Sequence, residues 1–256
     1  MQSEDHGDAE FMRSLARGMH VLQALCDARQ PQSIAMLSAR TGLSRAAVRR
    51  CLYTLRQLGY VVGELHAHTP APQIRALGHA YRSSTPLALK AQPLLDKLGQ
   101  ALQQACSVAV LNEDDIICVA NTNTSRAVSM SLSAGSCLPA YCSALGRVML
   151  AHLPAAQLDS YLGRTSLAAM TGQTVVSPTA LREVLAEVRR CGHALNDEEL
   201  EIGLRAIAVP VWSAACDEVV AALNVAVQAS QVSVDQLHRR FLPALRETAR
   251  ELSALL

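Results

Sequence analysis

The alternation of apolar and polar positions is sharpest between residues 34 and 59, where it predicts two short helices joined by a tight turn. The first helix is expected over residues 34–40. Gly42 suits the left-handed backbone of the turn, and Ser44 suits the N-cap of the second helix, residues 44–58. One face of that helix is expected to pack into a core and consists of Val48, Cys51, Leu52, Leu55 and Leu58. The opposite face carries Arg45, Arg49, Tyr53 and Arg56.

This arrangement is typical of a helix-turn-helix whose second helix enters the major groove of DNA. An ordinary amphipathic helix with a solvated basic face explains the same stretch equally well. If the helix reads DNA, its candidate contacts are Ser44, Arg45, Ala46, Arg49, Arg50 and Tyr53.

Helical spacing also predicts a helix over residues 11–29, which Gln30 and Pro31 end. Its apolar stripe is expected to comprise Leu15, Met19, Leu22 and Leu25 or Cys26. Its first turns carry two further candidate DNA contacts, Arg13 and Arg17. Residues 60–62 and 65–67 are β-prone and predict a hairpin, the wing of a winged helix, although its tip has no lysine or arginine. With no third ligand beside them, His66 and His68 are expected to be surface residues.

The rest of the chain mixes helical and strand-like stretches and predicts an α+β fold. A helix over residues 74–84 should place Ile74, Leu77 and Tyr81 on one side. Further helices are predicted over residues 87–104, 143–153, 155–162, 179–191 and 234–255, and strands over residues 107–111, 116–120, 127–133, 206–212 and 219–228. The last helix should turn inward Leu237, Phe241, Leu245, Thr248 or Ala249, and Leu252. We therefore expect a disordered tail (1–10), a winged helix-turn-helix domain (11–73), a linker helix (74–85) and a second domain (86–256).

Composition limits the classes of protein that fit. The chain has 256 residues, of which 50% are hydrophobic, enough for a core in each of two domains. No apolar run approaches the ~20 residues of a membrane span, and the acidic, polar N-terminus cannot be a signal peptide, so a cytoplasmic protein is expected. The eight cysteines include no CxxC pair. We expect reduced, mostly buried thiols and no zinc site, with Cys106, Cys118 and Cys216 inside strand-like runs or at their edges.

The net charge of +1 conceals an asymmetry that favours the DNA interpretation. Residues 11–85 hold ten arginines against two acids, whereas residues 86–256 hold 13 basic and 16 acidic side chains. A basic module beside a mildly acidic domain is typical of a protein that binds a polyanion. Arginine, the only base in that module, suits bidentate contacts with phosphate and guanine.

The chain resembles the IclR family of bacterial transcriptional regulators over roughly residues 11–255, and four stretches carry the resemblance. They are SLARGMHVLQAL (14–25), LSARTGLSRAAVRRCLYTLRQLGYV (37–61), LPAYCSALGRVMLA (138–151) and GHALNDEELEIGLRAIAVPV (192–211). SLARG, ALGHAYRSS (76–84) and Arg126 resemble the subgroup that regulates aromatic-acid catabolism. The resemblance implies a winged helix-turn-helix, a linker helix and a GAF/profilin-like effector-binding domain, in homodimers or homotetramers. Such regulators answer to acids like protocatechuate, 4-hydroxybenzoate or terephthalate and often activate transcription.

The resemblance also implies where a small aromatic carboxylate would bind. The positions nearest the ligand are Ala144, Leu145, Asn196, Ala206, Asn224 and Ala226, and the neighbouring loop adds Tyr141, Cys142 and Ser143. Amides at a helix N-terminus favour a carboxylate, and the asparagines can supply fixed hydrogen bonds. Arg126 and Arg205 are candidate bidentate partners of the acid. For Arg205 a structural ion pair with the acidic run 197–199 is the preferred interpretation, while the role of Arg126 stays open.

Two other classes of function compete with a ligand-controlled regulator. A cysteine-dependent enzyme could use Cys142 as nucleophile, His193 as base and Asp197 to orient it, but nothing in the spacing requires this, and no phosphate loop, HExxH or GxSxG motif occurs. A DNA-binding protein without a ligand would have little use for so long a second domain. The expected partners are double-stranded operator DNA, the effector, further copies of the chain and RNA polymerase. No cofactor, metal or membrane is expected.

Overall fold

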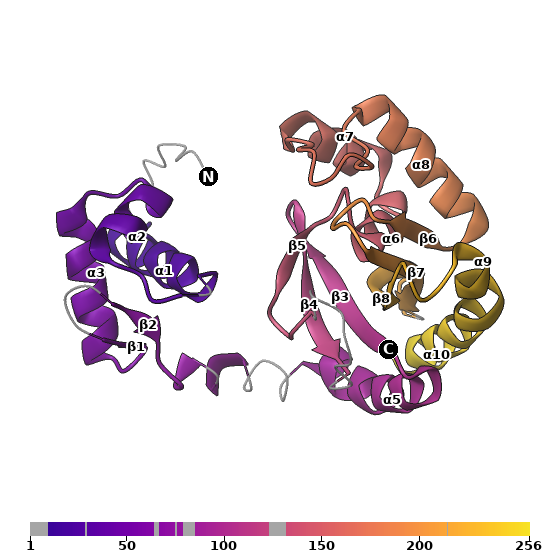
Figure 1. Cartoon of the computed structure of the whole chain (residues 1–256), viewed down its shortest axis with the longest axis horizontal. Coiled ribbons are helices and arrows are strands. Elements are labelled where there is room, and N and C mark those ends of the chain that lie inside the picture. The colour runs from indigo at the N-terminus through magenta and orange to yellow at the C-terminus, as the bar shows by residue number, and fades with distance from the viewer. Residues whose placement is uncertain are drawn as a thin grey trace. The chain divides into compact units, whose positions relative to one another are not determined.

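The computed structural model describes residues 10–28, 30–63, 67–74, 76–78, 85–122, 132–213 and 215–256. They fall into two compact units, Met1–Ala80 and Tyr81–Leu256, and each unit has a hydrophobic core of its own (Figure 1). The division falls inside the predicted linker, residues 74–85. Within the described ranges, no helix is long and apolar enough to cross a membrane.

The first unit contains the two helices and the turn that the sequence predicts. Its elements are α1 (Arg13–Cys26), α2 (Ile34–Thr41), α3 (Arg45–Gln57), β1 (Val61–Val62) and β2 (Thr69–Pro70). Gly42 ends α2 with a φ of 70°, and the Ser44 hydroxyl accepts the Ala47 amide at 3.3 Å to begin α3. Val48, Leu52 and Leu55 of α3 are buried, as predicted. These caps and this apolar face hold α3 against the other two helices.

Several predictions for this unit were wrong. Leu58 is 57% exposed, because α3 ends at Gln57 and the chain turns away through Gly59, whose φ is 80°. On α1, Leu15 and Met19 are 59% and 48% exposed, because the buried residues of this helix begin only at Val21. The wing's second strand is Thr69–Pro70, not residues 65–67, of which 65 and 66 lie outside the described residues.

His68 is buried and is not the surface residue that was expected. It exchanges two backbone hydrogen bonds of 2.9 Å with Gln32, so the segment between α1 and α2 adds a bridge to the wing's small sheet. His66 lies outside the described residues. In the predicted linker helix, residues 74 and 76–78 are helical; Ile74 packs against the core of the first unit, Leu77 is 54% exposed, and Tyr81 is not described.

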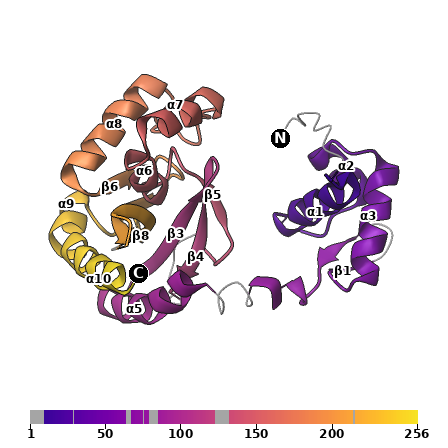
Figure 2. The same cartoon turned by 180° about the vertical axis from the view of Figure 1, so that it is seen from behind.

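The second unit is built on one six-stranded antiparallel sheet with the strand order β5-β4-β3-β8-β7-β6. Helices cover both faces, as the α+β prediction required (Figure 1 and Figure 2). The strands are β3 (Ala105–Asn112), β4 (Asp115–Asn121), β5 (Cys137–Pro139), β6 (Ala194–Asp197), β7 (Leu204–Ser213) and β8 (Glu218–Gln228). The helices are α5 (Pro86–Leu102), α6 (Ala144–Ala151), α7 (Ala155–Arg164), α8 (Pro178–Cys191), α9 (Val234–Gln236) and α10 (Leu242–Leu255).

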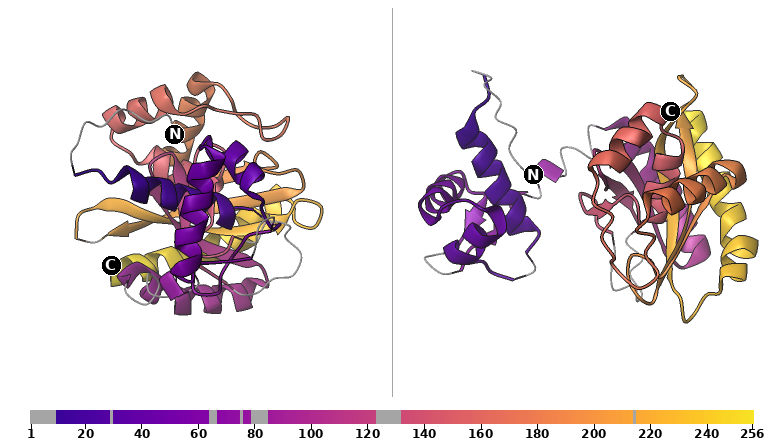
Figure 3. Two further views of the ribbon diagram at one scale, coloured as in Figure 1. Left: turned by 90° about the vertical axis from the view of Figure 1, so that its left-hand side faces the viewer. Right: turned by 90° about the horizontal axis from the view of Figure 1, so that it is seen from above.

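Strand β8 shows how the two faces of the sheet differ. Leu223, Val225 and Val227 point into the core shared with α5 and α10. Ala222, Asn224 and Ala226 alternate with them and therefore face α6. The small side chains on this face let α6 lie close to the sheet, with α7 and α8 outside it (Figure 3).

Several predictions made from the sequence for this unit were wrong or incomplete. β5 and β6 were not expected as strands, and most of the predicted strand 127–133 lies outside the described residues. The terminal helix is interrupted by a π-helical turn, Leu237–Phe241, which precedes Pro243. Cys216 is exposed in a turn. Only three of the eight cysteines are buried, so the expectation that most are buried was wrong.

Candidate functional site

The outward face of α3 carries the predicted DNA contacts. Arg45, Ala46, Arg49, Arg50 and Tyr53 are all exposed, as is the N-cap residue Ser44. The helix has no acidic side chain of its own. Among the described residues, none of its N-terminal arginines forms an ion pair. Their charges therefore stay available for an anionic partner.

Helix α1 adds positive charge beside this face. Arg17 and Arg50 both lie close enough to the Cys51 thiol to lower its pKa, although burial is the larger effect and raises it overall. Arg13 and Arg17 are both exposed. Further along α3, the Arg56 guanidinium lies 6.0 Å from the ring centre of Tyr53, which is 59% exposed. The structure thus brings the charged groups of α1 and α3 to neighbouring positions.

A cavity opens in the second unit between the N-terminus of α6 and the α6-facing side of the sheet. About 390 Å³ of space inside it is not filled by protein atoms, part of which is open to solvent. The lining residues are Leu132, Leu138, Ser143, Ala144, Leu145, Asn196, Leu200, Leu204, Ala206, Asn224 and Ala226.

One end of the cavity is formed by the first turn of α6. The Ser143 hydroxyl caps this helix by accepting the Gly146 amide at 3.1 Å, and the Ser143 carbonyl accepts the Arg147 amide at 2.9 Å. The amides of Ala144 and Leu145 belong to the first turn and have no intrahelical acceptor. Together with the helix dipole, they make this end suited to an anion.

Two buried asparagines supply the other polar groups. Asn196 is 1% exposed and Asn224 is 4% exposed. The Asn196 amide nitrogen donates to the Cys142 carbonyl, which fixes the orientation of the side chain. In the described part of the chain, the Oδ1 atoms of both asparagines find no hydrogen-bond donor. A buried acceptor without a donor costs ~1–3 kcal/mol, so both atoms are suited to bind a donor group on a ligand.

The register of the sheet explains why these positions meet. Asn196 of β6 pairs with Ala206 of β7, and Ala206 pairs with Ala226 of β8. Asn224 lies two residues before Ala226 on the same face. Seven of the effector positions implied by resemblance therefore line one cavity: Ser143, Ala144, Leu145, Asn196, Ala206, Asn224 and Ala226.

Of the other four implied positions, three do not line the cavity as described. Arg205 bonds to the Asp197 carboxylate at 2.6 Å and to the carbonyls of Ala229 and Val232, which is the structural ion pair that was preferred for it. Tyr141 and Cys142 lie just before Ser143, and the Tyr141 hydroxyl donates to the Ala168 carbonyl at 2.7 Å. Arg126 lies outside the described residues.

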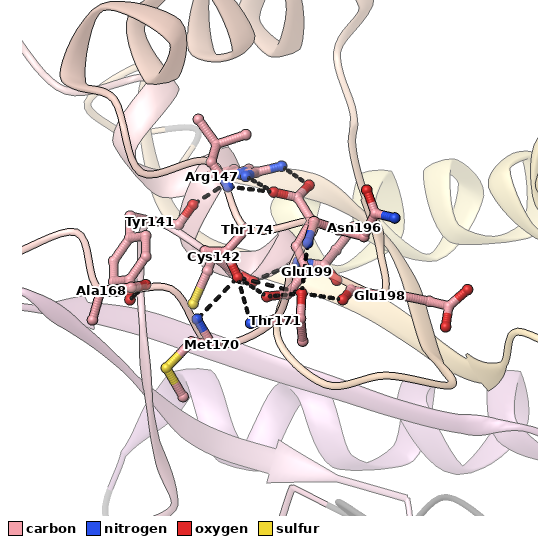
Figure 4. Close-up of polar contacts among 12 residues, drawn as sticks. Tyr141, Cys142, Arg147, Ala168, Met170, Thr171, Thr174, Asn196, Glu198 and Glu199 are labelled. Atoms are coloured by element: carbon pink, nitrogen blue, oxygen red, sulfur yellow. Dashed lines mark hydrogen bonds and ion pairs between the residues drawn. The ribbon is translucent and has the colours of Figure 1, made fainter.

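The sequence analysis did not identify Leu132, Leu138, Leu200 and Leu204, which also line the cavity, or a buried ion pair beside it. Arg147, which is 2% exposed, donates two hydrogen bonds to the Glu199 carboxylate (Figure 4). The signal was an arginine inside α6, whose other residues are apolar or glycine. A charge in such a helix needs a buried partner. That partner lies 52 residues away, so spacing could not identify it.

Among the described residues, no hydrogen bond or ion pair joins the three residues of the catalytic triad considered above. Burial raises the pKa of the Cys142 thiol to about 11, so it is protonated at neutral pH. His193 lies 3.0 Å from His238, nitrogen to nitrogen, and also contacts the Cys191 carbonyl. Asp197 is paired with Arg205. This geometry does not join a nucleophile to a base.

Comparison with known proteins matches both units of the chain. Residues 14–64 match the IclR helix-turn-helix domain, and residues 79–254 match the bacterial transcriptional regulator IclR C-terminal domain. The chain is 45% identical over 247 residues to the Pca regulon regulatory protein of Pseudomonas putida, covering 96% of this chain and 84% of that one. It is 32% identical over 258 residues to the p-hydroxybenzoate hydroxylase transcriptional activator of Acinetobacter baylyi, covering 99% and 95%.

A solved structure with a bound ligand resembles the second unit. It is a double mutant of the PobR transcription factor inducer-binding domain from Acinetobacter, in complex with 3-hydroxybenzoic acid. The TM-score is 0.61 at 32% identity, covering 65% of this chain and 97% of that one. The resemblance therefore includes a domain whose ligand is a small aromatic acid.

Proposed function

Because the chain belongs to the IclR family of bacterial transcriptional regulators, we propose that it activates an aromatic-acid catabolic operon when a small hydroxylated aromatic carboxylate binds its second unit. It is a DNA-binding regulator of the helix-turn-helix type. The proposal concerns the effector, the regulated genes and the activating output.

The polar pattern of the cavity is the observation that carries the effector assignment. The first-turn amides of Ala144 and Leu145 suit a carboxylate, and the unpartnered Oδ1 atoms of Asn196 and Asn224 suit hydroxyl donors. Between them the walls are leucine and alanine side chains, which suit an aromatic ring. A hydroxybenzoate has all three kinds of group.

The relatives support the same class of effector. The p-hydroxybenzoate hydroxylase activator is named for a step of aromatic-acid metabolism, and the PobR domain was solved with 3-hydroxybenzoic acid. The name of the first of these also supports activation as the output, with RNA polymerase as a further partner. A sensor returns its ligand unchanged, and we propose no enzymatic activity for this chain.

We also propose that the protein binds operator DNA as a homodimer or homotetramer, with the predicted linker, residues 74–85, joining the two units. A single helix-turn-helix reads a short half-site, and dimers bind half-sites about one helical turn, or a multiple, apart. The bases would be read by α3, and the phosphates would be contacted by the exposed arginines of α1 and α3.

The effector assignment predicts a strong preference for the ionised acid. 4-Hydroxybenzoate should bind more tightly than its methyl ester by about 1.5–3 kcal/mol, because the ester cannot accept charge-assisted hydrogen bonds from the α6 amides. Asn224→Ala should weaken binding of 4-hydroxybenzoate, with less effect on binding of benzoate, which has no hydroxyl donor. Isothermal titration calorimetry measures each affinity. Equal binding of acid and ester would contradict the proposed chemistry of the cavity.

The DNA assignment predicts that Arg49→Ala weakens operator binding by about 1–3 kcal/mol if Arg49 contacts a guanine. The loss should fall on the specific site more than on random DNA, since a base contact carries sequence information. Fluorescence anisotropy with labelled operator at fixed salt measures it. Arg190→Ala, which removes the same charge from an exposed position on α8, is the control and should leave affinity unchanged. Equal operator affinities for the two variants would show that Arg49 does not contact the operator.

A further inference from the structure

The segment between β6 and β7, residues 198–203, contributes Leu200 to the wall of the cavity, and we name it the cover segment. Its Leu200 side chain lines the cavity and is 7% exposed. The segment begins at Glu198, whose φ is 60°, and ends at Gly203, whose amide donates to the Glu198 carboxylate at 2.8 Å. Leu200 is thus held on a tight connection rather than on a strand.

Arg147 attaches the cover segment to α6. Its guanidinium donates to both carboxylate oxygens of Glu199, the residue before Leu200, and its Nε donates to the Tyr141 carbonyl at 2.9 Å (Figure 4). Neither Arg147 nor Glu199 is among the residues that line the described cavity. Because Arg147 is 2% exposed and Glu199 is 12% exposed, each charge needs the other to offset its lost hydration.

A second attachment reaches the same segment from outside. The Thr171 hydroxyl donates to the Glu198 carbonyl at 2.8 Å, and the Thr174 hydroxyl donates to the Glu199 carbonyl at 2.6 Å. The Val175 amide donates to the Glu199 carboxylate at 3.2 Å. Figure 4 shows Thr171 and Thr174 beside the backbone of Glu198 and Glu199. The backbone before Leu200 is therefore fixed from two directions.

We propose that Arg147 is a positioning residue for effector binding, acting through Glu199 to hold Leu200 against the bound ligand. The inference rests on the proposed function, since it concerns the same cavity. Arg147 lies on the helical turn whose first amides face the cavity, so its ion pair couples the anion-binding end to the apolar cover. Movement of the cover segment away from α6 would break this ion pair, so the pair opposes loss of the contact between Leu200 and a bound ligand.

A double-mutant cycle tests this mechanism. Glu199→Gln should raise the Kd for 4-hydroxybenzoate about tenfold, mainly through a faster dissociation rate. Leu200→Ala should have a similar effect, and adding Glu199→Gln to it should change the Kd little further, because the ion pair acts through Leu200. Stopped-flow and calorimetric titrations of the full chain measure rates and affinities. A purely structural ion pair would give additive losses, and that result would overturn the proposal.

Thr174→Val provides a second variant that leaves the buried charges paired. It removes the bond to the Glu199 carbonyl, so it should also speed dissociation of 4-hydroxybenzoate, without leaving Arg147 unpaired. Asp159→Asn is the matched control, because it weakens an ion pair between α7 and α8 that touches neither the cavity nor the cover segment. If Thr174→Val behaves like the control, Leu200 is not held in the way proposed.

A separate readout distinguishes failure of this proposal from failure of the proposed function. If unmodified protein does not bind 4-hydroxybenzoate, the effector assignment fails, but hydrogen–deuterium exchange without ligand still reports on the cover segment. Residues 199–203 should exchange faster in Glu199→Gln and Thr174→Val than in the unmodified chain. Unchanged exchange in both variants would overturn the positioning role whatever the ligand.

Discussion

Gly146→Ala is expected to lower the free energy of unfolding of the second unit by at least about 3 kcal/mol, at the upper end of the cost of overpacking. A Cβ atom at Gly146 would lie 2.2 Å from the Ala140 carbonyl oxygen and 2.3 Å from the Ala140 Cα. These are backbone atoms, so no side-chain rotation can relieve the clash. Either α6 or the segment before it must move.

The chain's single tryptophan makes this measurable. Trp212 packs edge-on against His152, which directly follows α6, with ring centres 5.2 Å apart. Urea unfolding followed by Trp212 fluorescence should therefore show a lower midpoint for Gly146→Ala. Gly163→Ala is the control: it lies on α7, no heavy atom lies within 4 Å of its added Cβ, and helix propensity should raise stability by about 0.5–1 kcal/mol. Equal midpoints for the two variants would contradict the close approach of α6.

Local signals in the sequence predicted the helix-turn-helix well. Ser44 and Gly42 act within a few residues of their positions, and the structure confirms both as helix caps. The predicted burial of Leu58 was wrong, because the spacing of apolar residues does not show at which residue a helix leaves the core. The predicted exposure of His68 was wrong, because its burial depends on a bridge to Gln32, 36 residues earlier.

The cavity was less accessible to sequence reasoning, since it forms only through the sheet. No spacing rule brings Asn196 beside Asn224; the register of β6, β7 and β8 does. Family resemblance named these positions, and the structure adds that both Oδ1 atoms are unpartnered among the described residues. β6 was missed because it is four residues long and holds Asn and Asp, which are unfavourable in strands. The Arg147–Glu199 pair joins a helix to a connection that follows β6, so its detection required β6 first.

Leu37→Ala is expected to lower the free energy of unfolding of the first unit by about 2–5 kcal/mol, the usual cost of removing a buried leucine. Leu37 is 0% exposed and packs in the core shared by α1, α2 and α3. A unit of this size buries little apolar surface to begin with, so this loss is a large part of its stability. Specific operator binding should be lost near the temperature at which the helices melt, because α3 depends on that core for its position.

Two probes separate the effect on each unit. Far-UV circular dichroism should show helix melting at lower temperature, while the Trp212 transition should remain in place, since the core around Leu37 contains only residues of the first unit. Met36→Ala is the matched control, because the Met36 side chain, next to Leu37 on α2, is 47% exposed and contributes little to that core. Calorimetric binding of 4-hydroxybenzoate by Leu37→Ala should equal that of the unmodified chain. A parallel loss of effector binding would show that the cavity depends on the core that positions α3.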